Sequence, residues 1–276
     1  MVLSATQHRV LTQEQLDFYN REGYLVIPGL LTPRDVAKIR DRFDEIGKAG
    51  KEIPGHWGPD TSPEAANDPL RRFPRVMMPH RFDAMIQEYL LDPRVLDVLR
   101  DLLDDEPLAA QSMFYYKPTG SRGQAFHQDD FYLKTQGGNC IAAWFAIDPS
   151  TPENGGLYIA PGTHRVDVAC PEKADTAKSF TSELVHPPAG HDPIPATLQP
   201  GDALFFNGRV IHGSIANDHP TMWRRSLINH YIPSKAVATS HWYFPLLDKD
   251  GNVVDREHAP EGGPCGTVTP AKAYAP

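Results

Sequence analysis

A histidine and two aspartates stand within four consecutive positions of the segment FHQDDFYL, as His127-Gln128-Asp129-Asp130. In an extended segment side chains alternate between two faces, so we expect His127 and Asp129 to point the same way and Gln128 the other way. His212, at the end of the apolar run NGRVIHGS, is a candidate for a third ligand. Two imidazoles and a carboxylate on one side of an iron(II) ion leave open positions opposite them, which is typical of non-haem iron oxygenases.

Other interpretations of these residues stay open at this point. Zinc hydrolases also use two histidines and a carboxylate, although often within a helical HExxH motif, which this sequence lacks. An isolated HxD motif is also common in surface turns. Asp130 directly follows Asp129, so we expect its side chain on the opposite face and assign it a supporting role in the loop.

A guanidinium and a hydroxyl follow His212 in the segment WRRSLINHYI. Arg224 and Ser226 are two positions apart, so in a strand they share a face. Together they can bind a carboxylate through charge-assisted hydrogen bonds. Two alternatives are a surface pair on an edge strand and a site in which Arg225 takes the place of Arg224.

Strands must position these residues. After Pro107 the chain consists of short apolar or alternating runs separated by clusters of Gly, Pro, Asn and Asp. Strands at this spacing predict a β-barrel or a β-sandwich. The runs are LAAQSMFYYK, CIAAWFAID, GGLYIAP, DALFFNG, RVIHGS and RRSLINHYIP.

Helices are predicted mainly in the first hundred residues. Thr12 with Gln15 has the spacing of a capping box, before a helix that Gly23 terminates. Two further helices are predicted to begin with an N-cap followed by proline, at Thr32 and at Asp92. We expect a single domain over residues 1–276. It has a helix-rich part (about 1–105), a β core (about 106–235) and a C-terminal extension (about 236–276).

The segments described so far resemble the phytanoyl-CoA dioxygenase family of iron(II)- and 2-oxoglutarate-dependent oxygenases. The resemblance covers roughly residues 10 to 235 and is strongest from residue 108 onward. Each motif alone has low specificity, whereas the combination in this order is highly specific. The matching segments are FHQDDFYL, AAWFAIDPSTPENGGLYIAPGTHR, GDALFFNGRVIHGSIAND and WRRSLINHYI.

The resemblance implies a mainly β protein with flanking helices, whose core is a double-stranded β-helix, or jelly roll. It also implies that His127, Asp129 and His212 hold iron(II), with dioxygen as a cosubstrate. Some relatives that halogenate have alanine or glycine in place of the aspartate. The presence of Asp129 therefore favours hydroxylation.

The resemblance further implies a site for 2-oxoglutarate. Arg224 matches the residue that binds the distal carboxylate of this cosubstrate, helped by Ser226 and Ser214. Gln128 and Trp144 match positions near the cosubstrate in relatives. We therefore expect a dioxygenase that hydroxylates an unactivated C–H bond of a small-molecule metabolite and releases succinate and carbon dioxide. The alternatives are a jelly-roll binding or regulatory protein without turnover and a zinc-dependent hydrolase on a cupin-like barrel.

The substrate pocket is expected from three variable segments: GHWGPDTSPEAANDPLRRFPR, the loop after Asp130, and HWYFPLL near the C-terminus. Tyr115, Tyr116 and Lys117 are further candidates for its lining. The basic cluster from Arg71 to Arg75 is either a solvated loop or a site for an anionic substrate group. Since no other basic cluster is visible for the phosphates of coenzyme A, a small metabolite is favoured over an acyl-CoA.

The bulk composition limits the partners. A formal net charge of -8 would repel a polyanion, so we expect no nucleic-acid partner. The sequence has neither a secretion signal nor an apolar stretch of the length that spans a membrane. The 3 cysteines have no CxxC spacing, which predicts neither a disulfide framework nor a zinc ribbon, and we expect a cytoplasmic protein. No feature of the sequence indicates the oligomeric state.

Overall fold

The predicted helix starts are confirmed in the computed structural model, which describes residues 9–262. Thr12 and Thr32 each form a capping box, and Asp92 caps the helix that starts with a proline. The first helix ends at Gly23, which has the left-handed backbone conformation (φ 81°) that glycine adopts without steric cost. The helices are α1 (Gln13–Glu22), α2 (Pro33–Ala49), α3 (Pro69–Arg72), α4 (Ala84–Leu90), α5 (Pro93–Leu103) and α6 (Asp130–Leu133).

The strands form a larger sheet and a smaller sheet that face each other. The larger sheet has the order β1-β10-β5-β12-β3-β14-β15, with β2 also paired to β3, and the smaller sheet has the order β4-β11-β6-β9. The strands of the larger sheet are β1 (Tyr24–Ile27), β2 (Val76–Met77), β3 (Pro107–Tyr115), β5 (Ile141–Ala146), β10 (Ala203–Asn207), β12 (Ser226–Pro233), β14 (Leu246–Leu247) and β15 (Val253–Val254). Those of the smaller sheet are β4 (Gln124–His127), β6 (Leu157–Ile159), β9 (Ile194–Ala196) and β11 (His212–Ser214). Short pairs join β7 (Glu172–Lys173) to β8 (Glu183–Leu184) and β13 (Ala238–Thr239) to β16 (Glu257–His258).

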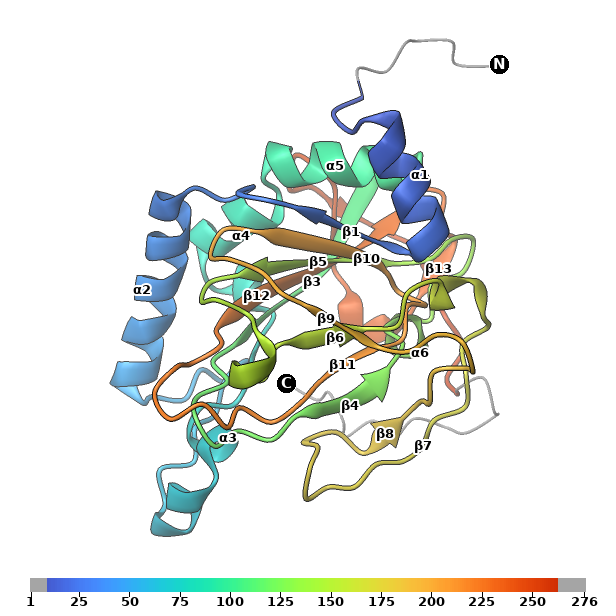
Figure 1. Cartoon of the computed structure of the whole chain (residues 1–276). Helices are drawn as coiled ribbons and strands as arrows, with labels where there is room; N and C mark the ends of the chain where they lie inside the picture. Colours follow the sequence, from blue (N-terminus) through green and yellow to red (C-terminus); the bar gives the residue numbers. More distant parts are fainter. Residues whose placement is uncertain (1–8, 263–276) are drawn as a thin grey trace, which may run out of the picture.

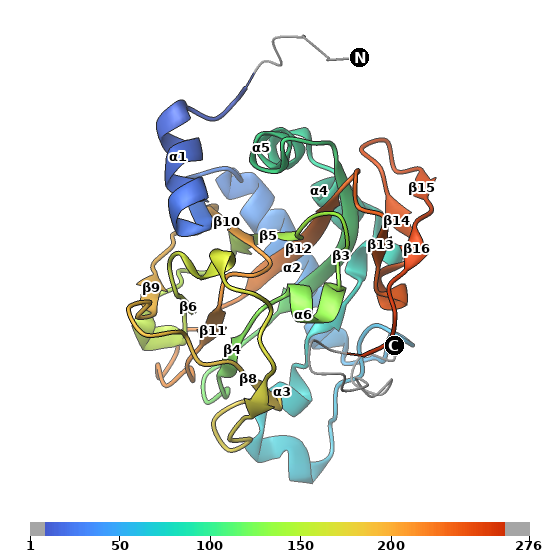
Figure 2. The same ribbon diagram turned by 90° about the vertical axis from the view of Figure 1, so that its right-hand side faces the viewer.

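The larger sheet buries both of its faces. On β10, Phe205 packs in the same cluster as Phe43 of α2, whereas Leu204 and Phe206 pack in a second cluster with Leu157 of the smaller sheet. Neighbouring side chains of a strand face opposite sides, and each large apolar side chain contributes roughly 1.5–3 kcal/mol when buried. The helices α2, α4 and α5 therefore cover one face, and the smaller sheet covers the other (Figure 1, Figure 2).

The C-terminal segment returns to the larger sheet. Leu247 pairs with Ala109 of β3, and Leu246 beside it is fully buried. The end of the predicted extension, residues 263–276, lies outside the described residues. Cys140 is a buried free thiol, whereas Cys170 is disulfide-bonded, which the cysteine count did not predict.

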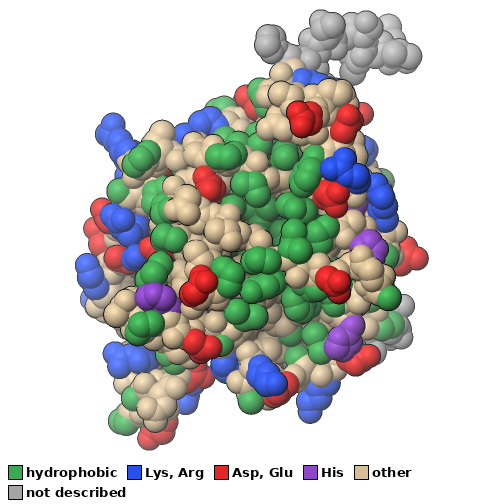
Figure 3. All heavy atoms as spheres, in the orientation of Figure 1, with side chains coloured by type: hydrophobic (Ala, Val, Ile, Leu, Met, Phe, Trp, Pro, Cys, Tyr) green, Lys and Arg blue, Asp and Glu red, His purple; other side chains and the backbone are tan. Residues whose placement is uncertain are grey.

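The surface carries both signs of charge. On the face in Figure 3, Lys and Arg side chains are interspersed with Asp and Glu, and apolar side chains gather toward the centre. Every helix within residues 9–262 is too short or too polar to cross a lipid bilayer.

Candidate metal and cosubstrate site

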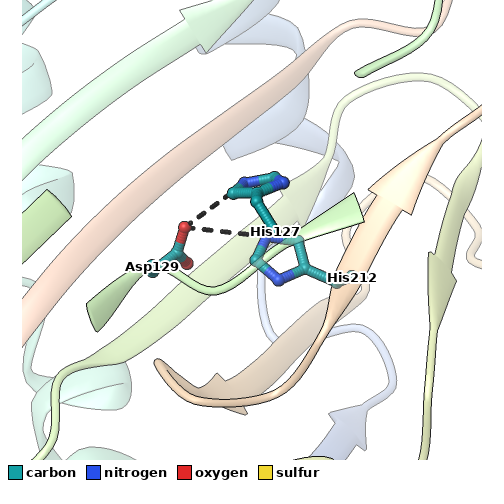
Figure 4. A group of neighbouring side chains, drawn as sticks. All are labelled: His127, Asp129 and His212. Atoms are coloured by element: carbon teal, nitrogen blue, oxygen red, sulfur yellow. Dashed lines mark ion pairs between the residues drawn. The ribbon is translucent and has the colours of Figure 1, made fainter. Parts of the chain in front are cut away.

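His127 and His212 face each other on neighbouring strands. His127 is the last residue of β4 and His212 is the first of β11, and the antiparallel register pairs them directly. Their ring centroids are 4.2 Å apart, and both side chains are buried. Residues directly opposed in an antiparallel pair have their side chains on one face. The pairing therefore brings together two imidazoles that are far apart in the sequence (Figure 4).

Asp129 reaches the same point by a route that we did not predict. The strand ends at His127, and Asp129 has helical backbone angles (φ -66°, ψ -33°) at the start of α6. The alternation of side chains in an extended chain does not apply there, so the prediction that His127 and Asp129 share the face of a strand was wrong. The turn into α6 directs Asp129 Oδ1 to 3.5 Å from His127 Nε2 and 3.7 Å from His212 Nε2 (Figure 4).

Backbone carbonyls fix the tautomer of both imidazoles. Nδ1 of His127 lies 2.9 Å from the carbonyl oxygen of Ala125, and Nδ1 of His212 lies 3.0 Å from that of Val210. A carbonyl oxygen only accepts, so each Nδ1 carries the hydrogen and each Nε2 keeps its lone pair. Burial also lowers the pKa of His212 to about 4, which keeps its imidazole neutral at neutral pH.

This donor set suits a divalent transition-metal ion. The ligand atoms of His127, Asp129 and His212 all lie within 4.8 Å of one another, and the three residues are buried. Ligand atoms about 2.1 Å from an ion and on adjacent octahedral positions are about 3 Å apart. A slight inward movement from the observed 3.5 and 3.7 Å therefore closes the site. Two imidazoles and one carboxylate on one side leave the opposite positions for other ligands.

His230 positions the carboxylate of Asp129. Its Nε2 lies 3.0 Å from Asp129 Oδ2, and both residues are buried. Because a carboxylate only accepts, Nε2 of His230 carries the hydrogen. His230 stands on the strand of Ser226, an even number of residues away, so both side chains face the same side.

Arg224 lies in the cavity that the three candidate ligands line, and it is 3% exposed. Its Nη1 donates to Ser226 Oγ at 3.0 Å and its Nε donates to the Gly155 carbonyl at 3.2 Å. The guanidinium also lies 5.5 Å from the centroid of the Trp144 ring. Burial lowers the pKa of Arg224 to about 10, so it remains charged at neutral pH. Within residues 9–262 no carboxylate forms a salt bridge with it.

Arg225 faces the opposite way. Its Nε and Nη2 donate to the two carboxylate oxygens of Asp148 at 2.8 and 2.9 Å, and its Nη1 donates to Asp44 of α2 at 2.7 Å. Its charge is therefore neutralised by carboxylates of the protein itself. Of the two arginines, Arg224 is the one that lines the cavity.

Lys117 is a second buried basic residue beside Arg224. It is 2% exposed, and its Nζ donates to Ser214 Oγ at 2.8 Å and to the Ile215 carbonyl at 2.6 Å. Burial, and then the charge of Arg224, lower the pKa of Lys117 well below its usual range. Lys117, which we expected in the lining of the substrate pocket, thus holds Ser214, and Ser214 lines the cavity of the candidate ligands.

Gln128 and Asp130 hold the loops around the site. Gln128 is fully buried; its Nε2 donates to the Arg209 carbonyl and its Oε1 accepts from the N–H of Ala169, both at 2.8 Å. Its amide joins two loops, and Gln128 is not among the residues that line the cavity of the candidate ligands. Asp130 Oδ1 accepts the N–H of Cys140 at 3.1 Å, in line with a supporting role.

A second cavity of about 480 Å³ adjoins the cavity of the candidate ligands. Its walls include residues 55–58 and 241–244, from two of the segments predicted for the substrate pocket. Tyr132, in the predicted loop after Asp130, and Tyr115 line the first cavity. Tyr116 is instead a core residue, fully buried, whose hydroxyl donates to a backbone carbonyl of α2.

A jelly roll with this His-Asp-His group defines a class, the non-haem iron oxygenases that depend on 2-oxoglutarate. The sequence profile of a family described as Phytanoyl-CoA dioxygenase (PhyH) matches residues 19–226. The chain belongs to the phytanoyl-CoA dioxygenase family. The resemblance seen in the sequence and the predicted class of enzyme are therefore confirmed.

Known proteins support this assignment. The phytanoyl-CoA dioxygenase domain-containing protein 1 of Danio rerio is 25% identical over 262 residues, which covers 75% of this chain and 86% of that protein. The methylphosphonate hydroxylase of Gimesia maris is 28% identical over 218 residues, covering 75% and 76%. The crystal structure of the epimerase SnoN with Fe3+, alpha ketoglutarate and nogalamycin RO has a TM-score of 0.62 and 19% identity, covering 91% and 95%. This structural likeness confirms the predicted jelly-roll fold.

Proposed function

We propose that this chain hydroxylates an unactivated C–H bond of a small-molecule metabolite, with iron(II) held by His127, Asp129 and His212 and 2-oxoglutarate held by Arg224. One observation carries the proposal. A buried arginine that has no carboxylate partner within residues 9–262 lines the same cavity as the three candidate ligands. A buried charge is costly unless it is paired, so this cavity favours an anion that also reaches the metal position.

The distal carboxylate of 2-oxoglutarate is held by Arg224 with Ser226 and Ser214. Ser214 Oγ accepts hydrogen bonds from Lys117 Nζ at 2.8 Å and from Gln124 N at 3.2 Å, so its own hydrogen remains to be donated. Ser226 Oγ accepts from Arg224. The guanidinium fork and these hydroxyls suit a planar carboxylate. The ring of Trp144 supports the guanidinium from its face.

Iron(II), 2-oxoglutarate and dioxygen supply the oxidation when bound: one oxygen atom of O2 forms the new C–OH bond, and the other enters succinate as 2-oxoglutarate loses CO2. The protein orients the reactants and excludes water. Phe206 and Ile228 contribute apolar surface to the lining of the cavity. The methylphosphonate hydroxylase and the epimerase SnoN are named for different reactions, so the shared fold does not determine the substrate.

We further propose a cytoplasmic protein that acts without a nucleic-acid partner, as one oxygenase domain over residues 1–276. The net charge of -8 supports the absence of a nucleic-acid partner, because it repels polyanions. The docking of Leu246 and Leu247 on the core supports a single domain, since it ties the described part of the C-terminal segment to the larger sheet.

The proposal is tested by succinate formation. The purified protein is supplied with iron(II), 2-oxoglutarate, ascorbate and air, alone and with a broad panel of metabolites. We expect succinate from the wild type, and a loss of at least about 100-fold in His127→Ala, since a missing ligand leaves the metal weakly held. The exposed His186 provides the control, His186→Ala. Equal rates in the wild type and His127→Ala, or no succinate from the wild type with any of the panel, would contradict the proposal.

A further inference from the structure

Gln124 reaches the candidate metal site through an irregularity of β4. It stands three residues before His127, and in a regular strand side chains at this odd spacing face opposite sides. Gln124 pairs with Ser214 of β11, however, whereas His127 pairs with His212, only two residues before Ser214. The extra residue of β4 forms a β-bulge, which turns Gln124 to the face of His127. Both side chains therefore line the same cavity.

Two contacts orient the amide of Gln124. The hydroxyl of Tyr115, at the end of β3, donates to its Oε1 at 3.5 Å, and its Nε2 lies 3.1 Å from Nε2 of His127. Because Nδ1 of His127 carries the ring hydrogen toward the carbonyl of Ala125, Nε2 of the ring accepts and the amide donates. The oxygen of the amide thus faces the larger sheet, and its nitrogen faces the metal position.

The lone pair of His127 Nε2 has two uses that exclude each other. It accepts the N–H of Gln124, and it belongs to the atom with which His127 would bind a metal ion. A neutral imidazole has one such lone pair. When the triad holds a metal ion, Gln124 therefore loses this acceptor, and its N–H needs another one in the same cavity.

The amide nitrogen of Gln124 also has a hydrogen to spare. It carries two hydrogens, and His127 is its one acceptor among the residues that the structure describes. An unpaired N–H in a water-poor site is costly. A ligand that brings an acceptor to the metal position is therefore favoured by Gln124.

The backbone of Gln124 lies beside the proposed cosubstrate site. Its N–H donates to Ser214 Oγ at 3.2 Å, and Ser214 lines the cavity together with Arg224. Gln124 therefore runs from the group proposed to hold the distal carboxylate of 2-oxoglutarate to the imidazole proposed to hold the metal. The acceptor that 2-oxoglutarate brings to this end is its other carboxylate, and a hydrogen bond to a carboxylate is stronger than one to a neutral group.

We infer that Gln124 binds the cosubstrate, and that its amide nitrogen donates a hydrogen bond to the carboxylate next to the 2-oxo group of 2-oxoglutarate. This inference rests on the proposed function. The lone pair of His127 and this carboxylate are alternative acceptors of the same N–H. Gln124 thus competes weakly with a metal ion that binds alone, and it favours the metal ion and 2-oxoglutarate together.

Two variants that keep the length of the side chain and lack its N–H groups test the inference, Gln124→Met and the isosteric Gln124→Glu. Competition with a chromogenic chelator under anaerobic conditions gives the Kd for iron(II). Anaerobic calorimetry gives the Kd for 2-oxoglutarate, with and without iron(II). The exposed Gln199 provides the control, Gln199→Met.

The expected changes in Gln124→Met have opposite signs. Iron(II) alone binds about 3-fold more tightly than to the wild type, because the competing hydrogen bond to His127 is lost. 2-Oxoglutarate binds the iron-loaded variant at least about 10-fold more weakly, because a charge-assisted hydrogen bond is lost. In Gln124→Glu this loss is at least as large, since two carboxylates repel each other. A general loss of structure weakens the binding of both iron(II) and 2-oxoglutarate.

Wild-type affinity for 2-oxoglutarate in either iron-loaded variant would overturn the inference. Weaker binding of iron(II) in Gln124→Met, or the same changes in Gln199→Met, would also overturn it. If the Gln124 variants bind 2-oxoglutarate normally while Arg224→Met does not, the inference is wrong and the proposed function stands. If the wild type does not bind 2-oxoglutarate, the proposed function fails, and the inference fails with it.

Discussion

Nε2 of His230 donates to Oδ2 of Asp129 across 3.0 Å, on the carboxylate oxygen opposite the one that approaches His127 and His212. The hydrogen bond comes from the larger sheet, whereas the two imidazoles belong to the smaller sheet. Asp129 is therefore fixed between the sheets, with Oδ1 directed to the metal position.

Removal of this hydrogen bond should weaken metal binding. In His230→Leu we expect the Kd for iron(II) to rise about 10-fold or more, because partners that orient ligands typically contribute 10- to 100-fold in affinity. His230→Gln retains an N–H donor and should recover part of the loss. Competition with a chromogenic chelator under anaerobic conditions measures the Kd. A His230→Leu protein that binds iron(II) like the wild type would show that Asp129 needs no such support.

Lys117 should contribute to the affinity for 2-oxoglutarate through its hydrogen bond to Ser214. In Lys117→Met we expect the Kd for 2-oxoglutarate to rise about 10-fold, since the loss of a buried hydrogen-bond partner costs about 1–3 kcal/mol. The KM for 2-oxoglutarate should rise likewise, with kcat little changed. The control is the exposed Lys178→Met. An unchanged Kd in Lys117→Met, measured calorimetrically, would contradict this role.

Arg225 should contribute to stability and not to cosubstrate binding. It connects Asp148 to Asp44 of α2, and its side chain is 17% exposed. In Arg225→Met we expect the free energy of unfolding in urea to fall by about 3 kcal/mol, since both carboxylates lose their partner. The Kd for 2-oxoglutarate should stay within about 2-fold of the wild type. If Arg225→Met loses 2-oxoglutarate while remaining folded, the assignment of the two arginines must be exchanged.

His80 should make the protein less stable in mild acid. Burial lowers its pKa from 6.5 to about 3 in the folded state, and its Nδ1 lies 2.6 Å from Ser112 Oγ. Between these two pKa values the unfolded chain binds the proton and the folded chain does not, so stability is full above pH 6.5 and is lost as the pH falls toward 3. The contribution of this one group approaches about 1.4 kcal/mol per pH unit. Urea unfolding at a series of pH values should show a smaller slope in His80→Asn; an unchanged slope would assign the effect to other groups.

Features set by neighbouring residues could be predicted from the sequence. The capping boxes at Thr12 and Thr32 and the terminating Gly23 depend on contacts within one helix. His127 and His212 were found because their motifs stand in a recognisable order. Asp129 was selected by an argument about an extended strand, although the backbone there is helical.

Features set by distant segments could not be predicted. Arg224 was selected through the resemblance and its shared face with Ser226, but the contact of Arg225 with Asp44, which α2 brings to the outer face of the sheet, has no signal in the sequence. The amide of Gln128 is used by two loops whose positions no local pattern reveals. The hydrogen bond from Lys117 to Ser214 likewise joins residues 97 positions apart in the sequence. Lys117 follows β3 of the larger sheet, whereas Ser214 ends β11 of the smaller sheet.

The most direct test is an anaerobic calorimetric titration of 2-oxoglutarate into the protein with and without iron(II), for the wild type and Arg224→Met. We predict binding of one molecule of 2-oxoglutarate per chain in the wild type, at least about 10-fold tighter with iron(II) than without it, and a loss of at least about 100-fold in Arg224→Met. An affinity that does not depend on iron(II), or that is the same in Arg224→Met, would contradict a site in which the triad and Arg224 hold the metal and the cosubstrate together.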